Sequence, residues 1–156
     1  MDVIYLDFAK AFDKLDFGIT LAKLSMLGIN GKVGKWLHSF LTERTQTVIV
    51  NGEKSEPAPV LSDVPQGSVV GPMLFLILIS DIDKNVSASF LSSFADDTRI
   101  GLGINSPDDV KQLQDDLNEV YKWAKDNNMS FNSKKFELLR YGKKQSPKRI
   151  YTILVR

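Results

Sequence analysis

The sequence predicts an α+β fold in which a small antiparallel sheet has helices packed on one face. Three observations predict it: an apolar strand pattern at Val3–Phe8, helical stripes of apolar residues with capping residues, and two turn signals between strand-like runs. The chain has 156 residues, of which 43% are hydrophobic and 25% charged. These values are typical of one compact domain with a core of its own.

The first half of the chain contains one strand, two helices and a hairpin. The strand at Val3–Phe8 carries Asp7 near its end, and a helix follows over Gly18–Leu27. The second helix has Asn30 as its predicted cap. Its apolar face, which we expect to be buried, comprises Val33, Trp36, Leu37, Phe40 and Leu41. In the segment 46–56, an Asn-Gly pair between two strand-like runs predicts a hairpin.

The second half repeats these patterns. A helix over Met73–Ile82 has Pro72 in its first turn, and a longer one opens at Ser106 and closes at Asn127. Its inward face is predicted to hold Val110, Leu113, Leu117, Val120, Tyr121 and Ala124. The segments "MSFN" (129–132), "FELLRYG" (136–142) and "RIYTILVR" (149–156) resemble strands.

Composition excludes several kinds of site. Cysteine is absent and His38 is the single histidine, so disulfides, thiol nucleophiles and cysteine or histidine metal clusters are excluded. His38 lies off the apolar stripe of its helix and is interpreted as a surface residue. The apolar run Val69–Ile79 is too short to cross a bilayer, and no signal segment opens the chain, so we expect an intracellular protein without membrane contact, in either nucleus or cytoplasm.

Charge is divided unevenly along the chain. Residues 132–156 contain eight basic residues and one acidic residue, a balance of 8 − 1 = +7, which leaves −6 for residues 1–131 of a chain whose net charge is +1. A basic tail beside an acidic body is typical of a protein that binds a polyanion and also holds cations. A solvated charge run near a terminus is the competing interpretation.

Two adjacent acids lie in the strand-like stretch "SSFADDTRIG" (92–101). Asp96 and Asp97 suit an exposed hairpin turn, and they also suit a metal site. Together with Asp7 they can gather three carboxylates on one rim of a sheet, where mutual repulsion makes cations necessary. Two Mg²⁺ ions would neutralise such a cluster.

Four segments in order resemble motifs A to D of one family. They are "YLDFAKAFD" (5–13), "SDVPQGSVVGPMLFLILISDI" (62–82), "SFADDTRI" (93–100) and "MSFNSKKFELL" (129–139). The family is that of the reverse transcriptases encoded by non-LTR (LINE-type) retrotransposons of the jockey and CR1 kind. The resemblance implies a polymerase palm acting as an RNA-directed DNA polymerase on an RNA template, a DNA primer and dNTPs.

The resemblance also implies site residues. Asp7, Asp96 and Asp97 match the acids that hold two Mg²⁺ ions, with Mn²⁺ as a substitute, and activate the primer 3′-hydroxyl. Lys135 matches the motif D lysine that protonates or stabilises the leaving pyrophosphate. One more solvated lysine beside Lys134 is the competing interpretation.

Nucleotide and nucleic-acid contacts follow from the same match. Phe8, Phe12, Gln66 and Gly67 correspond to nucleotide-binding positions, with Phe12 as the ring that excludes a ribose 2′-hydroxyl. From its residue type alone, Phe12 is more simply a core aromatic. The basic residues that we expect to contact nucleic acid are Lys134, Arg140, Lys143 and Lys144.

The chain departs from the family pattern at three positions. Asp63 stands where glycine is usual before Val-Pro-Gln-Gly, Phe17 where histidine is common, and Phe136 where a small residue is usual. A negative charge at Asp63 would oppose phosphate binding.

Residues 1–156 are therefore expected to form a partial reverse transcriptase domain, the palm and the base of the fingers, with incomplete fingers and no thumb. A longer native polypeptide would supply these parts. Without them an apolar patch should be exposed, which predicts poor solubility or self-association. Two alternatives to the polymerase stay open: a catalytically inert remnant that binds nucleic acid, and a repurposed fragment that binds a protein partner.

Overall fold

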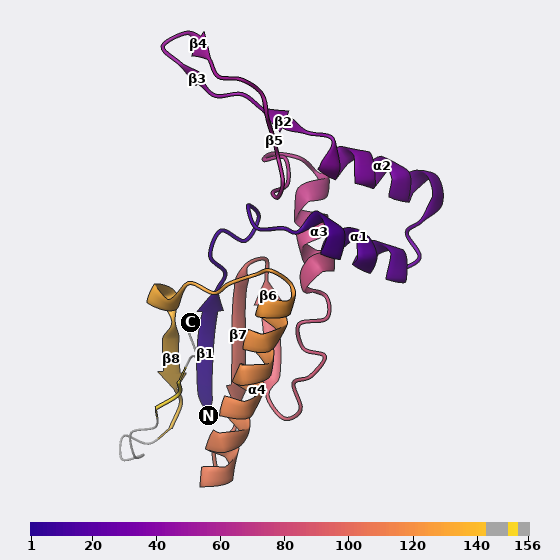
Figure 1. Cartoon of the computed structure of the whole chain (residues 1–156). Coiled ribbons are helices and arrows are strands. Elements are labelled where there is room, and N and C mark those ends of the chain that lie inside the picture. The colour runs from indigo at the N-terminus through magenta and orange to yellow at the C-terminus, as the bar shows by residue number, and fades with distance from the viewer. Residues whose placement is uncertain (143–149, 153–156) are drawn as a thin grey trace. The chain divides into compact units, whose positions relative to one another are not determined.

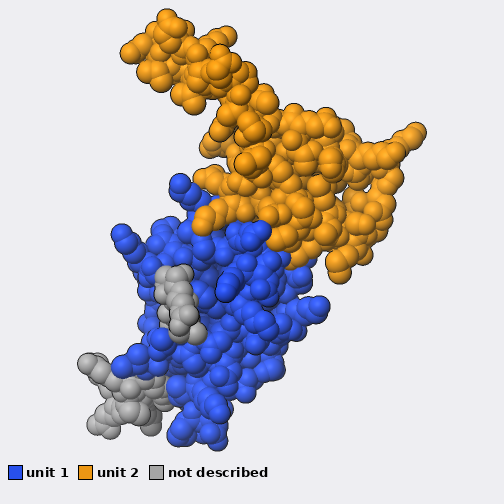
Figure 2. Space-filling model, in the orientation of Figure 1, with its two compact units in different colours: residues 1–11, 79–156 blue, residues 12–78 orange. Residues whose placement is uncertain are grey.

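The computed structural model describes residues 1–142 and 150–152 and has two compact units. Figure 2 shows the division: one unit combines residues 1–11 with the chain from residue 79 onward, and the other is residues 12–78. We call them unit 1 and unit 2 and describe each by itself. Lys143, Lys144 and most of the strand predicted at 149–156 lie outside the described residues.

Unit 1 contains a four-stranded antiparallel sheet in the order β6-β7-β1-β8 (Figure 1). Its strands are β1 (Asp2–Asp7), β6 (Phe90–Phe94), β7 (Asp97–Leu102) and β8 (Glu137–Arg140). Strand β1 has partners on both sides, and Val3, Ile4 and Leu6 are almost fully buried. The predicted α+β class with an antiparallel sheet is confirmed.

Helix α4 (Pro107–Asp126) packs against this sheet. It begins as the sequence predicts: the Ser106 hydroxyl accepts a hydrogen bond from the Asp109 amide, and the Asp109 carboxylate accepts one from the Ser106 amide. The buried residues of α4 include Leu113, Leu117, Val120 and Ala124. The 3.6-residue pattern therefore identifies the helix, its start and its buried face.

A buried carboxylate on α4 holds the chain segment that enters β6. Asp116 is 2% exposed and accepts hydrogen bonds from the backbone amides of Ser87, Ala88 and Ser89 at 2.8–3.1 Å. Burial alone would raise the pKa of Asp116, but the hydrogen bonds to its charged form outweigh burial and lower the pKa to about 2. In the sequence, the signal for this contact is the position of an acid on the apolar stripe of α4.

The segment between α4 and β8 corrects one strand prediction. Residues 129–132 make a single antiparallel bridge, Phe131 with Phe8, and no strand. Pairing stops because the Asn132 side chain accepts a hydrogen bond from the Lys134 amide and caps a 3₁₀ turn, η1 (Ser133–Lys135). The strand predicted from residue 136 onward is confirmed as β8. Residues 150–152 form no strand, and Tyr151 donates its hydroxyl to Asp2.

Unit 2 is made of helices and a narrow hairpin. Its elements are α1 (Phe17–Met26), α2 (Gly31–Thr42), β2 (Thr45–Gln46), β3 (Ile49–Val50), β4 (Glu53–Lys54), β5 (Ala58–Pro59) and α3 (Val70–Ile79), whose last residue is assigned to unit 1. Asp16 caps α1 by accepting from the Ile19 amide. The predicted Asn-Gly hairpin is confirmed: β2 pairs with β5, β3 pairs with β4, and all eight strand residues are exposed.

The apolar face of α2 is only partly buried. Leu37 and Leu41 are buried, but Val33 is 58% and Trp36 53% exposed. Helix α1 covers one part of this face. In the part that α1 leaves uncovered, the ring of Trp36 stacks on that of Phe40, with ring centroids 5.3 Å apart. Asn30 occupies the cap position without a side-chain cap bond. The predicted helix is therefore confirmed, and its apolar face is buried at Leu37 and Leu41.

Helix α3 begins and ends three residues earlier than predicted, at Val70 rather than Met73 and at Ile79 rather than Ile82. Pro72 lies in its first turn, as expected, and Leu74, Phe75 and Leu78 are fully buried. Within the part of the chain that the structure describes, no helix is both long and apolar enough to span a bilayer.

Candidate active site

Two of the predicted acids face each other across neighbouring strands. In the antiparallel register of β1 and β7, Asp7 lies directly opposite Asp97. In the register of β6 and β7, Asp97 also lies opposite Phe94, so residues 95–96 close a two-residue turn. Asp96 is therefore in a turn beside the end of β1. The sheet therefore brings Asp7 close to Asp96 and Asp97, which follow it by about 90 residues in the sequence.

The turn that carries Asp96 has an unusual backbone. Ala95, its first residue, has φ 53°, in the left-handed region where a side chain is unfavourable. Hairpins with such turns generally place glycine or asparagine there. Asp96 is half-buried and Asp97 is exposed. Strain at this turn is sustained by the sheet that pairs on either side of it.

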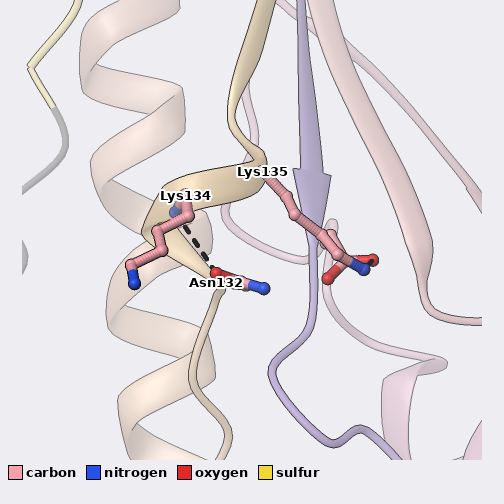
Figure 3. A network of polar contacts seen from close by, with 4 residues as sticks. Asn132, Lys134 and Lys135 are labelled. Carbon is pink, nitrogen blue, oxygen red and sulfur yellow. Dashed lines mark hydrogen bonds and ion pairs between the residues drawn. The ribbon is translucent and has the colours of Figure 1, made fainter.

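Lys135 reaches the same end of the sheet. Its Nζ lies 3.1 Å from Oδ1 of Asp7, and the Lys135 side chain is 61% exposed while that of Asp7 is 16% exposed. The contact depends on η1, because the Asn132 amide donates to the carbonyl of Asp7 at 2.8 Å and fixes the turn beside β1. Lys134 leaves the same turn in a different direction (Figure 3).

The carboxylates are neighbours without forming a metal cluster. Among residues 1–142 and 150–152, no three acidic or histidine side chains are close enough together to hold an ion. Asp96 lies in the turn whereas Asp97 begins β7, and the Lys135 ammonium is bound to Asp7. In donor chemistry the three carboxylates match a divalent cation such as Mg²⁺, which prefers hard oxygen ligands.

Phe8, one of the residues predicted to bind a nucleotide, is buried. Its side chain is 2% exposed, stacks on Phe131 at 4.5 Å and meets Trp123 edge-on at 6.2 Å. Phe8 is thus part of the core of unit 1, and its ring has no surface with which to contact a nucleotide. The physical reason is alternation along the extended chain, which turns Phe8 away from the side of Asp7.

Lys134 and Arg140, the two described residues among the basic ones predicted to bind nucleic acid, lie at different ends of β1. Lys134 belongs to η1, beside Asp7, and is exposed. Arg140 pairs with Asp2 in the register of β1 and β8, and its Nε lies 4.0 Å from a carboxylate oxygen of Asp2. Asp2 and Asp7 are five positions apart along β1, which corresponds to roughly 17 Å. Arg140 is therefore remote from Asp7.

Three predicted nucleotide-binding residues belong to unit 2. Phe12 is half-buried, and its ring lies 5.0 Å from that of Phe75. Gln66 and Gly67 are exposed, and Gly67 has φ 80°, which only glycine adopts readily. A Cβ at Gly67 would meet no atom within 4 Å, so the need for glycine there comes from the backbone alone.

Asp63 has the most unusual backbone of the non-glycine residues described. Its φ is 98°, beyond the usual left-handed region. The Arg44 guanidinium donates a hydrogen bond to its carbonyl, which holds this conformation. The sequence departs from the family at this position, where glycine is usual. The positive φ at this position explains why glycine is usual there, whereas the sequence had indicated only the charge of Asp63.

Comparisons with known proteins agree on one family. The family described as reverse transcriptase (RNA-dependent DNA polymerase) matches residues 3–151. The RNA-directed DNA polymerase from mobile element jockey of Drosophila melanogaster is 32% identical over 139 residues, covering 84% of this chain. The probable RNA-directed DNA polymerase from transposon X-element of the same organism is 30% identical over 137 residues, covering 85% of this chain. The chain spans 15% of the length of each of these relatives.

Solved structures share the fold. Telomerase from Candida tropicalis, in complex with a fragment of telomeric RNA, superposes with a TM-score of 0.72 over 97% of this chain and 27% of its own, at 15% identity. The apo telomerase from the same organism gives a TM-score of 0.68 at 14% identity. The arrangement of strands and helices is thus similar to that of a region of these telomerases.

Proposed function

The chain belongs to the reverse transcriptase family of RNA-dependent DNA polymerases, and on this premise we propose that it forms the catalytic palm of a retrotransposon polymerase. The reaction is nucleotidyl transfer: the primer 3′-hydroxyl attacks the α-phosphorus of a dNTP, a P–O bond forms, and pyrophosphate leaves. The observation that carries the proposal is the register of β1 and β7, which places Asp7 opposite Asp97 beside the turn of Asp96.

Asp7, Asp96 and Asp97 would hold two Mg²⁺ ions, with Mn²⁺ as a substitute, because carboxylate oxygens are the ligands these hard cations prefer. When bound, such ions promote loss of the proton from a hydroxyl nucleophile and stabilise charge on the leaving oxygen. The protein's own contribution is position. Strand pairing fixes the backbone of Asp7 and Asp97, and the buried Asp116 secures the segment that leads into β6.

Lys135 is proposed to assist the leaving group. Its ammonium already reaches the end of the sheet, 3.1 Å from Asp7. At this position a lysine can donate a proton to, or hydrogen-bond with, a pyrophosphate oxygen. The exposed side chain has the freedom to do so.

Substrate contacts complete the proposal. RNA is the proposed template, the primer is DNA, and Gln66 and Gly67 approach the nucleotide with an exposed backbone. Phe12 is proposed to exclude a 2′-hydroxyl, with Lys134, Arg140, Lys143 and Lys144 contacting phosphates. The fingers and thumb are proposed to come from a longer polypeptide.

Primer extension on an RNA template with dNTPs and Mg²⁺ or Mn²⁺ tests the proposal. Asp96→Asn and Asp97→Asn should each reduce extension by about 100-fold or more, since each removes a charged cation ligand. Asp115→Asn, which changes the same charge at an exposed site on α4, should leave extension unchanged.

Other outcomes would favour the alternatives. A folded chain that extends no primer but binds RNA in a salt-sensitive manner, equally with and without Asp96, would be a nucleic-acid-binding remnant. A folded chain that neither extends a primer nor binds RNA would instead be a protein-interaction fragment.

A further inference from the structure

The ion pair between Lys135 and Asp7 has a consequence for cation binding. The ammonium lies 3.1 Å from Oδ1 of Asp7, so it occupies a lone-pair direction of an oxygen that a cation ligand must offer. Asp97 lies directly opposite Asp7 in the register of β1 and β7. Lys135 thus acts on Asp7 as a monovalent substitute for a cation.

The contact follows from the local fold rather than from a freely moving side chain alone. Two backbone bonds fix the segment beside the end of β1: the Ala9 amide donates to Ser130, and the Asn132 amide donates to Asp7. The Lys135 amide then donates to the Asn132 carbonyl, which closes η1. Because the turn is anchored to the carbonyl of Asp7 itself, the root of Lys135 stays beside the Asp7 carboxylate.

We propose that Lys135 competes with the divalent cation for Asp7, so that cation binding and release of the lysine are one exchange. The inference rests on the proposed function and extends it. Without a cation the lysine holds Asp7, and with a cation the lysine is released toward the phosphates of the nucleotide. The leaving-group lysine therefore becomes available only when the acid site is filled.

The competition must be weak to be useful. The Lys135 side chain is 61% exposed, and exposed ion pairs are readily broken by solvent and salt. The lysine should accordingly raise the dissociation constant of the cation by roughly two- to fivefold, the range that an exposed pair supports.

Mn²⁺ binding to the chain alone, without nucleic acid or dNTP, tests the exchange. The loss of the electron paramagnetic resonance signal of free Mn²⁺ gives the dissociation constant directly. Lys135→Met removes the ammonium at nearly constant length and should lower the constant roughly two- to fivefold. Lys134→Met is the matched control. It removes the same charge from the neighbouring residue, whose side chain points in a different direction from that of Lys135 (Figure 3).

Two further variants complete the test. Lys135→Arg keeps a cation beside Asp7 and should retain the weaker binding of the natural chain, whereas Asp7→Asn should remove the site. Equal dissociation constants for Lys135→Met and Lys134→Met would overturn the exchange and leave the polymerase proposal intact. Absence of any Mn²⁺ binding that depends on Asp7 would overturn both.

Discussion

Two hairpins of this chain have two-residue turns and are stabilised in opposite ways. The β3–β4 hairpin turns through Asn51 and Gly52, with φ of 53° and 88°, which are the residues such a turn prefers. Its strand residues are all exposed. The β6–β7 hairpin turns through Ala95 and Asp96, with Ala95 in the left-handed region, but its strands belong to a packed sheet.

The difference shows how a turn can carry an acid in place of a preferred turn residue. In β3–β4, local turn chemistry supplies most of the stability, because there is little packing. In β6–β7, the buried Thr98 and Ile100 and the Ser93–Thr98 side-chain hydrogen bond supply it instead. Because packing of the strands holds the turn in place, the turn residues need not be the best turn formers. An acid can therefore occupy a position where a preferred turn residue would provide no carboxylate.

Removing the anchor of the β6–β7 hairpin should have the largest effect on this comparison. Asp116→Ala leaves the amides of Ser87, Ala88 and Ser89 without their acceptor and should lower the free energy of unfolding by about 3 kcal/mol. Urea denaturation followed by circular dichroism measures it. Asp115→Ala, at an exposed neighbour on α4, is the control and should cost little. Equal losses for both variants would contradict the anchor.

Acid should weaken the same hairpin. The folded-state pKa of Asp116 is lowered to about 2 from an ordinary value of 3.8, so its stabilisation is complete above pH 3.8 and is lost as the pH falls through 2. The loss should reach about 2 kcal/mol. Denaturant midpoints between pH 5 and pH 2 measure it. Asp116→Asn should flatten this dependence, and an unchanged slope in that variant would assign the acid sensitivity elsewhere.

The β3–β4 hairpin should instead depend on its turn. Gly52→Ala places a side chain at φ 88° with no atom within 4 Å of its Cβ, so backbone strain alone should cost about 1 kcal/mol. Amide exchange of Ser55, which donates to Val48, should accelerate about fivefold. The melting temperature of the whole chain should stay constant, since the hairpin is exposed. A large drop in that temperature would show that the hairpin is coupled to the core.

Relieving strain at the β6–β7 turn should produce the smallest change. Ala95→Gly removes the Cβ at φ 53° and should raise the free energy of unfolding by about 0.5 kcal/mol, after the greater flexibility of unfolded glycine is included. Thermal unfolding measures the gain. Ala88→Gly, at a position without positive φ, should lower stability and serves as the comparison. A loss for Ala95→Gly would mean that the turn is unstrained.

Local patterns predicted much of this fold because their causes are local. The Asn51-Gly52 turn, the cap at Ser106 and the strand ending at Asp7 each depend on residues within a few positions. The motif order likewise identified the acids that the register brings side by side. These features need no knowledge of distant contacts.

Features that depend on distant partners could not be predicted in this way. The burial of Phe8 requires Phe131 and Trp123, and the role of Asp116 requires amides 27–29 residues away. The exposure of Trp36 depends on how much of α2 another helix covers. At Asp63 the sequence directed attention to charge, whereas the backbone angle explains why glycine suits that position. The spacing of motif residues in a sequence does not indicate such backbone angles.

The central position of β1 also determines the order in which the chain can fold. Its residues pair with the segment around Asp97 and, at Asp2, with Arg140, whereas unit 2 is complete at residue 78. During synthesis at about 5–20 residues per second, β1 waits roughly 1 to 5 seconds after unit 2 is finished for its partner β7, and roughly 3 to 12 seconds for its second partner β8. Pairing over such separations is slow, so β1, which is made before the other three strands of its sheet, exposes its apolar residues until those strands are available.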